Sequence, residues 1–117
     1  MAVGALYCAL AIAAGAFGAH GLRGRLDAAA LALWETSARY LMYTGLGLIV
    51  MGLAQLHAPR AGFALAAPLA AAGGLIFSGT VAALALGAPR WLGAVTPLGG
   101  LALIVSFLIL AWSALRG

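Results

Sequence analysis

Apolar residues fill four long runs of the chain, and polar residues gather in the segments between them. The runs cover about residues 1–19, 40–56, 63–86 and 97–115. A hydrocarbon core about 30 Å thick needs about 20 apolar residues in a helix, and each run is near that length. None alternates apolar and polar residues, as a strand of a membrane β-barrel does. The pattern predicts an all-α integral membrane four-helix bundle, formed by one transmembrane domain over residues 1–117.

The connection between the first two runs, residues 20–39, is the most polar part of the chain. It opens with glycines that favour a chain reversal, and Asp27 is placed to cap a helix that begins at Ala28. Beyond it, apolar positions recur every three or four residues. We predict a short amphipathic segment that either lies at the membrane interface or runs directly into the second transmembrane helix. Trp34 and Tyr40 are the expected interfacial anchors.

The other two connections are short turns that contain Pro and Arg. The last is followed by Thr96-Pro97, a pair typical of an N-cap and the first helical position. We therefore expect residues 91–95 to form an interfacial segment and the fourth helix to begin at Pro97. A longer fourth helix that is kinked at Pro97 is the alternative.

Composition indicates that lipid is the solvent. The chain is 66% hydrophobic and 7% charged, where soluble domains average roughly 45–50% and about 25%. So few charged side chains do not cover a soluble fold. The six basic residues are arginines at the ends of apolar runs, which favours contact with lipid headgroups over binding of nucleic acid. Membrane lipid is therefore an expected partner, and nucleic acid is not.

The arginines also predict an orientation. The first and third connections share one side of the membrane and carry most of these residues, and the other side has two: Arg23, Arg25, Arg90 and Arg39 against Arg60 and Arg116. The positive-inside rule then puts both termini on the non-cytoplasmic side. Residues 1–6 contain no Lys or Arg that could form the charged start of a signal peptide, so we interpret the first run as a retained helix.

Small residues recur in all four runs at spacings that let helices approach closely. We predict helix packing at seven glycines: Gly15, Gly18, Gly45, Gly52, Gly74, Gly99 and Gly100. Some of these stripes are alternatively contact surfaces for partner helices. Gln55, Ser78 and Thr96 are the polar side chains expected at membrane depth, either as hydrogen-bonding links between helices or as the lining of a path or pocket.

Candidate chemistry is sparse. Glu35 and Arg39 have the spacing of a helical ion pair, and with His20 they form one possible charged site for a ligand. Alternatively, His20 bonds the last carbonyls of the first helix. The sequence contains no metal-ligand pattern, phosphate loop or nucleophile motif, and the single Cys8 is expected to act as a small apolar residue. We expect no metal, no other cofactor and no enzymatic activity.

Four segments occur together in an order that resembles the domain of unknown function 423 family. They are the sequence GAFGAH at residues 15–20, the stretch 34–43, FSG at 77–79 and TPLGG at 96–100. The resemblance covers almost the whole chain. It implies a small four-helix protein of the bacterial inner (cytoplasmic) membrane, and it implies little about function because the family's role is unnamed.

One departure from the family pattern affects the candidate site. The family commonly has Gln after Tyr40 and His near position 44, whereas this chain has Leu41 and Thr44. If that polar pair is the working site in relatives, this chain lacks it. His20, Glu35 and Arg39 are then the remaining ionisable candidates.

These observations favour a non-catalytic accessory or scaffolding subunit that packs against partner helices and lipid in a larger membrane complex. One alternative is a homo-oligomeric transporter or channel, lined by the few polar residues at membrane depth. Another is a binder of quinone or lipid that uses His20, Glu35 and Arg39, with Ser78 and Thr96 as further contacts.

Overall fold

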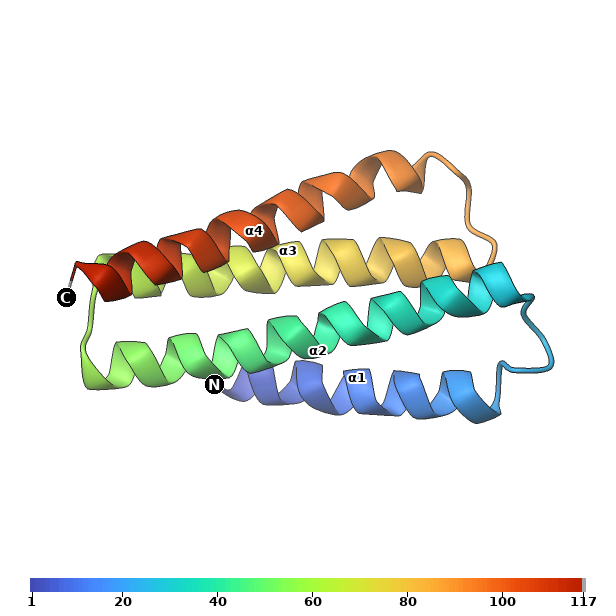
Figure 1. Cartoon of the computed structure of the whole chain (residues 1–117), viewed down its shortest axis with the longest axis horizontal. Helices are drawn as coiled ribbons and strands as arrows, with labels where there is room; N and C mark the ends of the chain where they lie inside the picture. The colour runs from blue at the N-terminus through green and yellow to red at the C-terminus, as the bar shows by residue number, and fades with distance from the viewer. Residues whose placement is uncertain (117) are drawn as a thin grey trace.

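The computed structural model describes residues 1–116, which form four α-helices. They are α1 (Ala2–His20), α2 (Ala28–His57), α3 (Ala61–Ala85) and α4 (Leu92–Leu115). The helices run up and down, so that the α1–α2 and α3–α4 connections lie at one end and the α2–α3 turn lies at the other, near the end of α4 (Figure 1). Each helix is long and apolar enough to cross a membrane. The prediction of an all-α membrane protein with four helices is confirmed.

The second helix begins earlier than the apolar pattern indicates. Asp27 caps it, with Oδ1 accepting a hydrogen bond from the Ala30 N–H at 2.8 Å. The amphipathic segment therefore runs directly into the second helix, and the predicted start at about residue 40 is wrong. With 30 residues, α2 is about 45 Å long. It exceeds a hydrocarbon core of about 30 Å, so its amphipathic first part extends toward the headgroups.

The fourth helix also begins earlier, at Leu92. Thr96 is inside the helix, where its Oγ1 donates to the Leu92 carbonyl at 3.2 Å. The predicted cap at Thr96 is therefore wrong. The structure has the longer fourth helix that was the alternative, with Pro97 inside it. Pro97 is the sixth residue of α4, so the backbone bond to the Gly93 carbonyl is lost, a cost that membrane helices tolerate where neighbouring groups satisfy the freed carbonyl.

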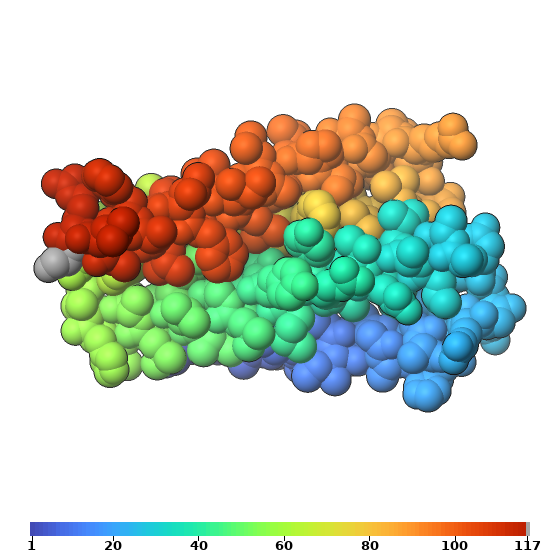
Figure 2. Space-filling model, in the orientation of Figure 1, coloured from blue at the N-terminus to red at the C-terminus, as the bar shows by residue number. Residues whose placement is uncertain are grey.

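The helices form an open bundle with extents of 49 × 27 × 17 Å. Successive helices pack along their lengths, whereas α2 and α4 touch at few positions. On α2, Gly45 faces α1 and Gly47 faces α4. On α3, Ala71 faces α1 and Gly73 faces α4. Residues two apart lie on nearly opposite sides of a helix. The cross-section is therefore a Z, with α1 on one side of the central α2–α3 pair and α4 on the other. In Figure 2, α2 lies in front of much of α1, and part of α3 is visible between α2 and α4.

Close approaches at glycines hold neighbouring helices together. A Cβ at Gly45 would lie 2.7 Å from Cys8 Sγ and 2.8 Å from the Gly4 carbonyl oxygen, so a side chain there does not fit between α1 and α2. At Gly99, a Cβ would lie 2.6 Å from the Phe77 backbone nitrogen, which brings α3 and α4 equally close. Four more of the predicted glycines lie against a side chain: Gly18 on Trp34, Gly52 on Met1, Gly74 on Thr44 and Gly100 on Phe77.

Gly15 differs from the other predicted packing glycines. A Cβ at this position would meet nothing within 4 Å, so the predicted close contact is not part of the structure. The buried core lies instead toward the other end of the bundle. It joins α2, α3 and α4 through Leu48, Met51, Ala66, Ala70 and Leu103.

Candidate functional site: two membrane-facing grooves

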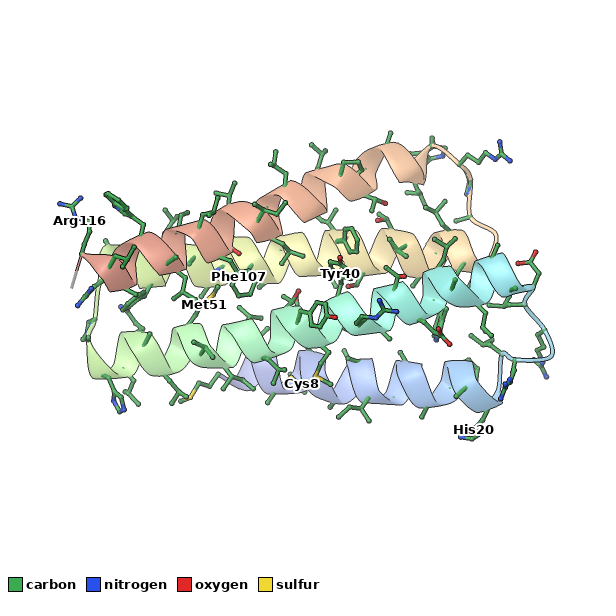
Figure 3. All side chains as sticks on the ribbon, viewed as in Figure 1. Cys8, His20, Tyr40, Met51, Phe107 and Arg116 are labelled. Atoms are coloured by element: carbon green, nitrogen blue, oxygen red, sulfur yellow. The ribbon has the colours of Figure 1, made fainter. Side chains whose placement is uncertain are left out.

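The three predicted ionisable residues do not form one site. His20, Glu35 and Arg39 are all exposed, and within residues 1–116 no hydrogen bond or ion pair joins any two of them. Figure 3 shows His20 at the end of α1, directed away from the bundle. The predicted Glu35–Arg39 ion pair is therefore absent from the described residues, which leaves the Arg39 guanidinium without a partner there.

The three polar residues predicted at membrane depth are also separated. Gln55 lies near the end of α2, where its Oε1 accepts a hydrogen bond from the Arg60 N–H at 3.0 Å. Ser78 and Thr96 lie toward the opposite end, about 27 Å away at a rise of about 1.5 Å per residue. Gln55 therefore does not share a lining with the other two.

Four hydroxyl groups lie at one level of the bundle. Ser37 Oγ donates to the Ser78 carbonyl at 2.7 Å, and the hydroxyls of Thr80 and Thr96 are 2.6 Å apart. These bonds link α2 to α3 and α3 to α4. Ser37 and Thr80 were not predicted, because a partner on another helix leaves no signal in the local sequence. The polarity of residues 35–37 is the one hint that the sequence offers.

Ser78 stands apart in this group. It is 4% exposed, and its Oγ has no hydrogen-bond partner within the described part of the chain. A buried hydroxyl without a partner costs about 1–3 kcal/mol. The oxygen itself is buried within the bundle, so a new partner reaches it only when the Ser78 side chain or its neighbours move.

Two aromatic side chains tie α1 to the bundle. The Tyr7 hydroxyl donates to the Ala71 carbonyl of α3 at 2.7 Å, and the Trp34 indole N–H donates to the Ala14 carbonyl of α1 at 2.8 Å. Trp34 also packs edge-on against Phe17, with ring centroids 6.2 Å apart. The Trp34 ring lies between α1 and α2, and its predicted depth at the membrane interface stays a prediction.

The first groove lies between α1 and α3, with α2 as its floor, and we name it the α1–α3 groove. It consists of two cavities of about 220 and 260 Å³. Small residues line much of it, and Tyr7 and Trp34 line the cavity at the end that holds Ser78. The groove residues with Gly, Ala or Ser side chains are Gly4, Ala14, Ser37, Gly52, Ala67, Ala71, Ser78, Gly79 and Ala82.

The second groove lies between α2 and α4 on the opposite side of the central pair, and we name it the α2–α4 groove. Its volume is about 420 Å³, within the range of about 300–1,000 Å³ that is typical of small-molecule sites. Tyr40 and Tyr43 line one end and Phe107 lines the other. In Figure 3, Tyr40 and Phe107 lie between α2 and α4.

The two positions that depart from the family pattern lie in different grooves. Leu41 lines the α1–α3 groove and Thr44 lines the α2–α4 groove. The Thr44 hydroxyl is already bonded to the Tyr40 carbonyl at 2.8 Å. These positions therefore do not form a single site in this chain. Within residues 1–116, no group of three or more His, Cys, Asp or Glu side chains is arranged to hold a metal ion.

Comparison with known proteins gives consistent matches over most of the chain. A sequence model of the family described as protein of unknown function (DUF423) matches residues 14–100. The UPF0382 membrane protein SERP0230 of Staphylococcus epidermidis is 41% identical, over 97% of this chain and 93% of the relative. The UPF0382 membrane protein YwdK of Bacillus subtilis is 39% identical, over 97% of this chain and 94% of the relative. No solved structure matches the chain.

Proposed function

The chain belongs to the DUF423 family of membrane proteins, and on this basis we propose that it is a non-catalytic accessory subunit of the bacterial inner membrane. In this proposal a transmembrane helix of a larger complex docks in the α1–α3 groove. Both termini are on the non-cytoplasmic side, as the distribution of arginines favours.

The observation that carries the proposal is the unpartnered Ser78 hydroxyl in a groove lined by small residues. Small side chains let helix backbones approach closely in lipid, and hydroxyl groups bond across such interfaces. A docked helix with a polar side chain at this level would satisfy the Ser78 Oγ once a change of rotamer turns the hydroxyl toward the groove, because the oxygen is buried in the isolated chain. It would also cover the side of α1 that faces α3, where the Tyr7 hydroxyl bonds the Ala71 carbonyl.

The distribution of the other polar groups supports an accessory role over transport. A conduction path needs polar groups that converge along the membrane normal. In the described chain, Ser37, Thr44, Thr80 and Thr96 each bond to a helix carbonyl or to one another. These bonds stabilise the bundle and leave the two grooves mainly apolar.

Native mass spectrometry of the protein extracted in a mild detergent tests the proposal. We expect a stoichiometric complex with a larger membrane protein. Gly79→Leu should release this partner, because Gly79 lines the groove and a Cβ there meets nothing within 4 Å, so the added side chain fills the groove without disturbing the fold.

Gly93→Leu is the matched control, since Gly93 is exposed in the first turn of α4 and its Cβ would approach only Leu84, at 4.0 Å. This variant should keep the partner. Detection of the wild-type protein without a larger partner contradicts the proposal. Equal retention of the partner by Gly79→Leu and Gly93→Leu contradicts it as well.

A further inference from the structure

The α2–α4 groove has a positive charge at its rim. Arg39 is exposed and lies one helical turn before Tyr43, so the two side chains share a face of α2. Tyr43 lines the groove and is 52% exposed. Within residues 1–116, no salt bridge joins the Arg39 guanidinium to Glu35, which lies one turn earlier on α2, or to another carboxylate.

The depth of Arg39 matches the boundary of the hydrocarbon core. Along α2, Arg39 is about 27 Å from His57 at about 1.5 Å per residue. Near His57 lie Arg60 and Arg116, with Trp112 beside the latter, and these mark one membrane surface. A hydrocarbon core about 30 Å thick therefore ends close to Arg39 on the other side. Lipid phosphates lie just beyond this boundary.

The shape of the groove favours a flexible chain over a helix. Phe107 extends from α4 to α2, where its ring lies directly against Gly47 and leaves no room for a Cβ there. The ring thus closes the groove at the end away from Arg39. A transmembrane helix needs a groove that extends across the whole hydrocarbon core, whereas an acyl chain can end against the Phe107 ring.

We propose that the α2–α4 groove binds one phospholipid molecule, with an acyl chain in the groove and the phosphate paired with Arg39. Guanidinium and phosphate form charge-assisted, often bidentate hydrogen bonds. The tyrosine rings at the open end are suited to the interfacial depth of the lipid glycerol region. This site lies across the molecule from the α1–α3 groove, so it is independent of the accessory role proposed above.

The test uses the purified, delipidated protein and native mass spectrometry with added phosphatidylglycerol. Wild type should retain one phosphatidylglycerol molecule. Arg39→Gln should weaken retention by about tenfold, a change of about 1.4 kcal/mol. Arg90→Gln removes one positive charge from the same end of the bundle, in the α3–α4 connection, and should retain the lipid like wild type.

A second pair of variants tests the groove itself. Ile104→Trp fills the groove from α4, while Leu101→Trp adds the same bulk at a comparably exposed position that does not line it. Only Ile104→Trp should lose the lipid. Equal loss in Arg39→Gln and Arg90→Gln, or retention by Ile104→Trp, overturns the proposal, because binding would then be nonspecific charge attraction or would not use the groove.

Discussion

The Tyr7 hydroxyl on α1 bonds the Ala71 carbonyl on α3 at 2.7 Å, across the groove that separates these two helices. Because α1 otherwise packs on α2, this bond is the side-chain hydrogen bond that links α1 to α3 within residues 1–116. It lies between the two cavities of the α1–α3 groove and spans the groove at that level.

Tyr7→Phe should therefore weaken the attachment of α1 to α3 and lower the free energy of unfolding. Hydrogen bonds between membrane helices average about 0.6 kcal/mol, with a maximum of about 1.7, and we expect a loss of stability in this range. Equilibrium unfolding in mixed detergent micelles measures it. Tyr43→Phe is the control, because the Tyr43 hydroxyl has no hydrogen-bond partner in residues 1–116 and the ring is exposed. Equal stability of Tyr7→Phe and wild type would show that the bond contributes nothing.

Glycines of α1 and α2 should respond differently to a larger side chain. Gly45→Val places methyl groups where Cys8 Sγ and the Gly4 carbonyl already lie, within 2.8 Å of the new Cβ. Overpacking of this kind costs about 1–3 kcal/mol, and backbone on the facing side leaves little room for relaxation. We expect a lower unfolding midpoint and loss of the α1–α2 contact.

Gly15→Val is the matched control for this pair, since its Cβ meets nothing within 4 Å. Its unfolding midpoint should stay close to that of wild type. The reverse order of the two midpoints would contradict the arrangement of α1 on α2.

The sequence was sufficient to predict the four helices, because an apolar run of about 20 residues has few other structures in lipid. It was less informative about where helices begin. Thr96-Pro97 has the chemistry of a cap, but the Thr96 hydroxyl instead bonds Leu92 and Thr80. Since Thr80 belongs to another helix, local sequence could not reveal that the helix extends back to Leu92.

The candidate site was predicted less well for the same reason. The spacing of Glu35 and Arg39 indicates a shared helix face, but an exposed pair gains little from contact, and it does not form in the described structure. The grooves depend on how each helix is rotated about its axis. Leu41 and Thr44 are three residues apart in the sequence, yet they line opposite sides of the bundle.

The orientation predicted from the arginines can be measured by cysteine labelling. In a Cys8→Ser background, Ala58→Cys places a thiol in the α2–α3 turn and Arg25→Cys places one in the α1–α2 connection, and both positions are exposed. With both termini outside the cytoplasm, a membrane-impermeant maleimide should label Ala58→Cys in cells whose outer barrier is open. Arg25→Cys should react only after the inner membrane is disrupted. The opposite pattern would reverse the topology.

Arg60 should contribute more to stability than Arg116, although both are arginines at the same end of the bundle. The Arg60 guanidinium donates to the Ser113 carbonyl near the end of α4 and lies 5.4 Å from the centroid of the Phe63 ring. The last carbonyls of a helix have no partner within the helix, so Arg60 supplies one and ties α4 to the start of α3.

Arg60→Gln should lower stability by about 1–3 kcal/mol, the range for a hydrogen bond to a charged group. Arg116→Gln removes the same charge, but Arg116 is exposed and lies over the exposed Trp112 ring, 5.6 Å from its centroid. Since exposed contacts of this type are worth about 0.5–1 kcal/mol, its unfolding midpoint should change less. Equal midpoints for the two variants in detergent would mean that charge at this end matters and the bond to Ser113 does not.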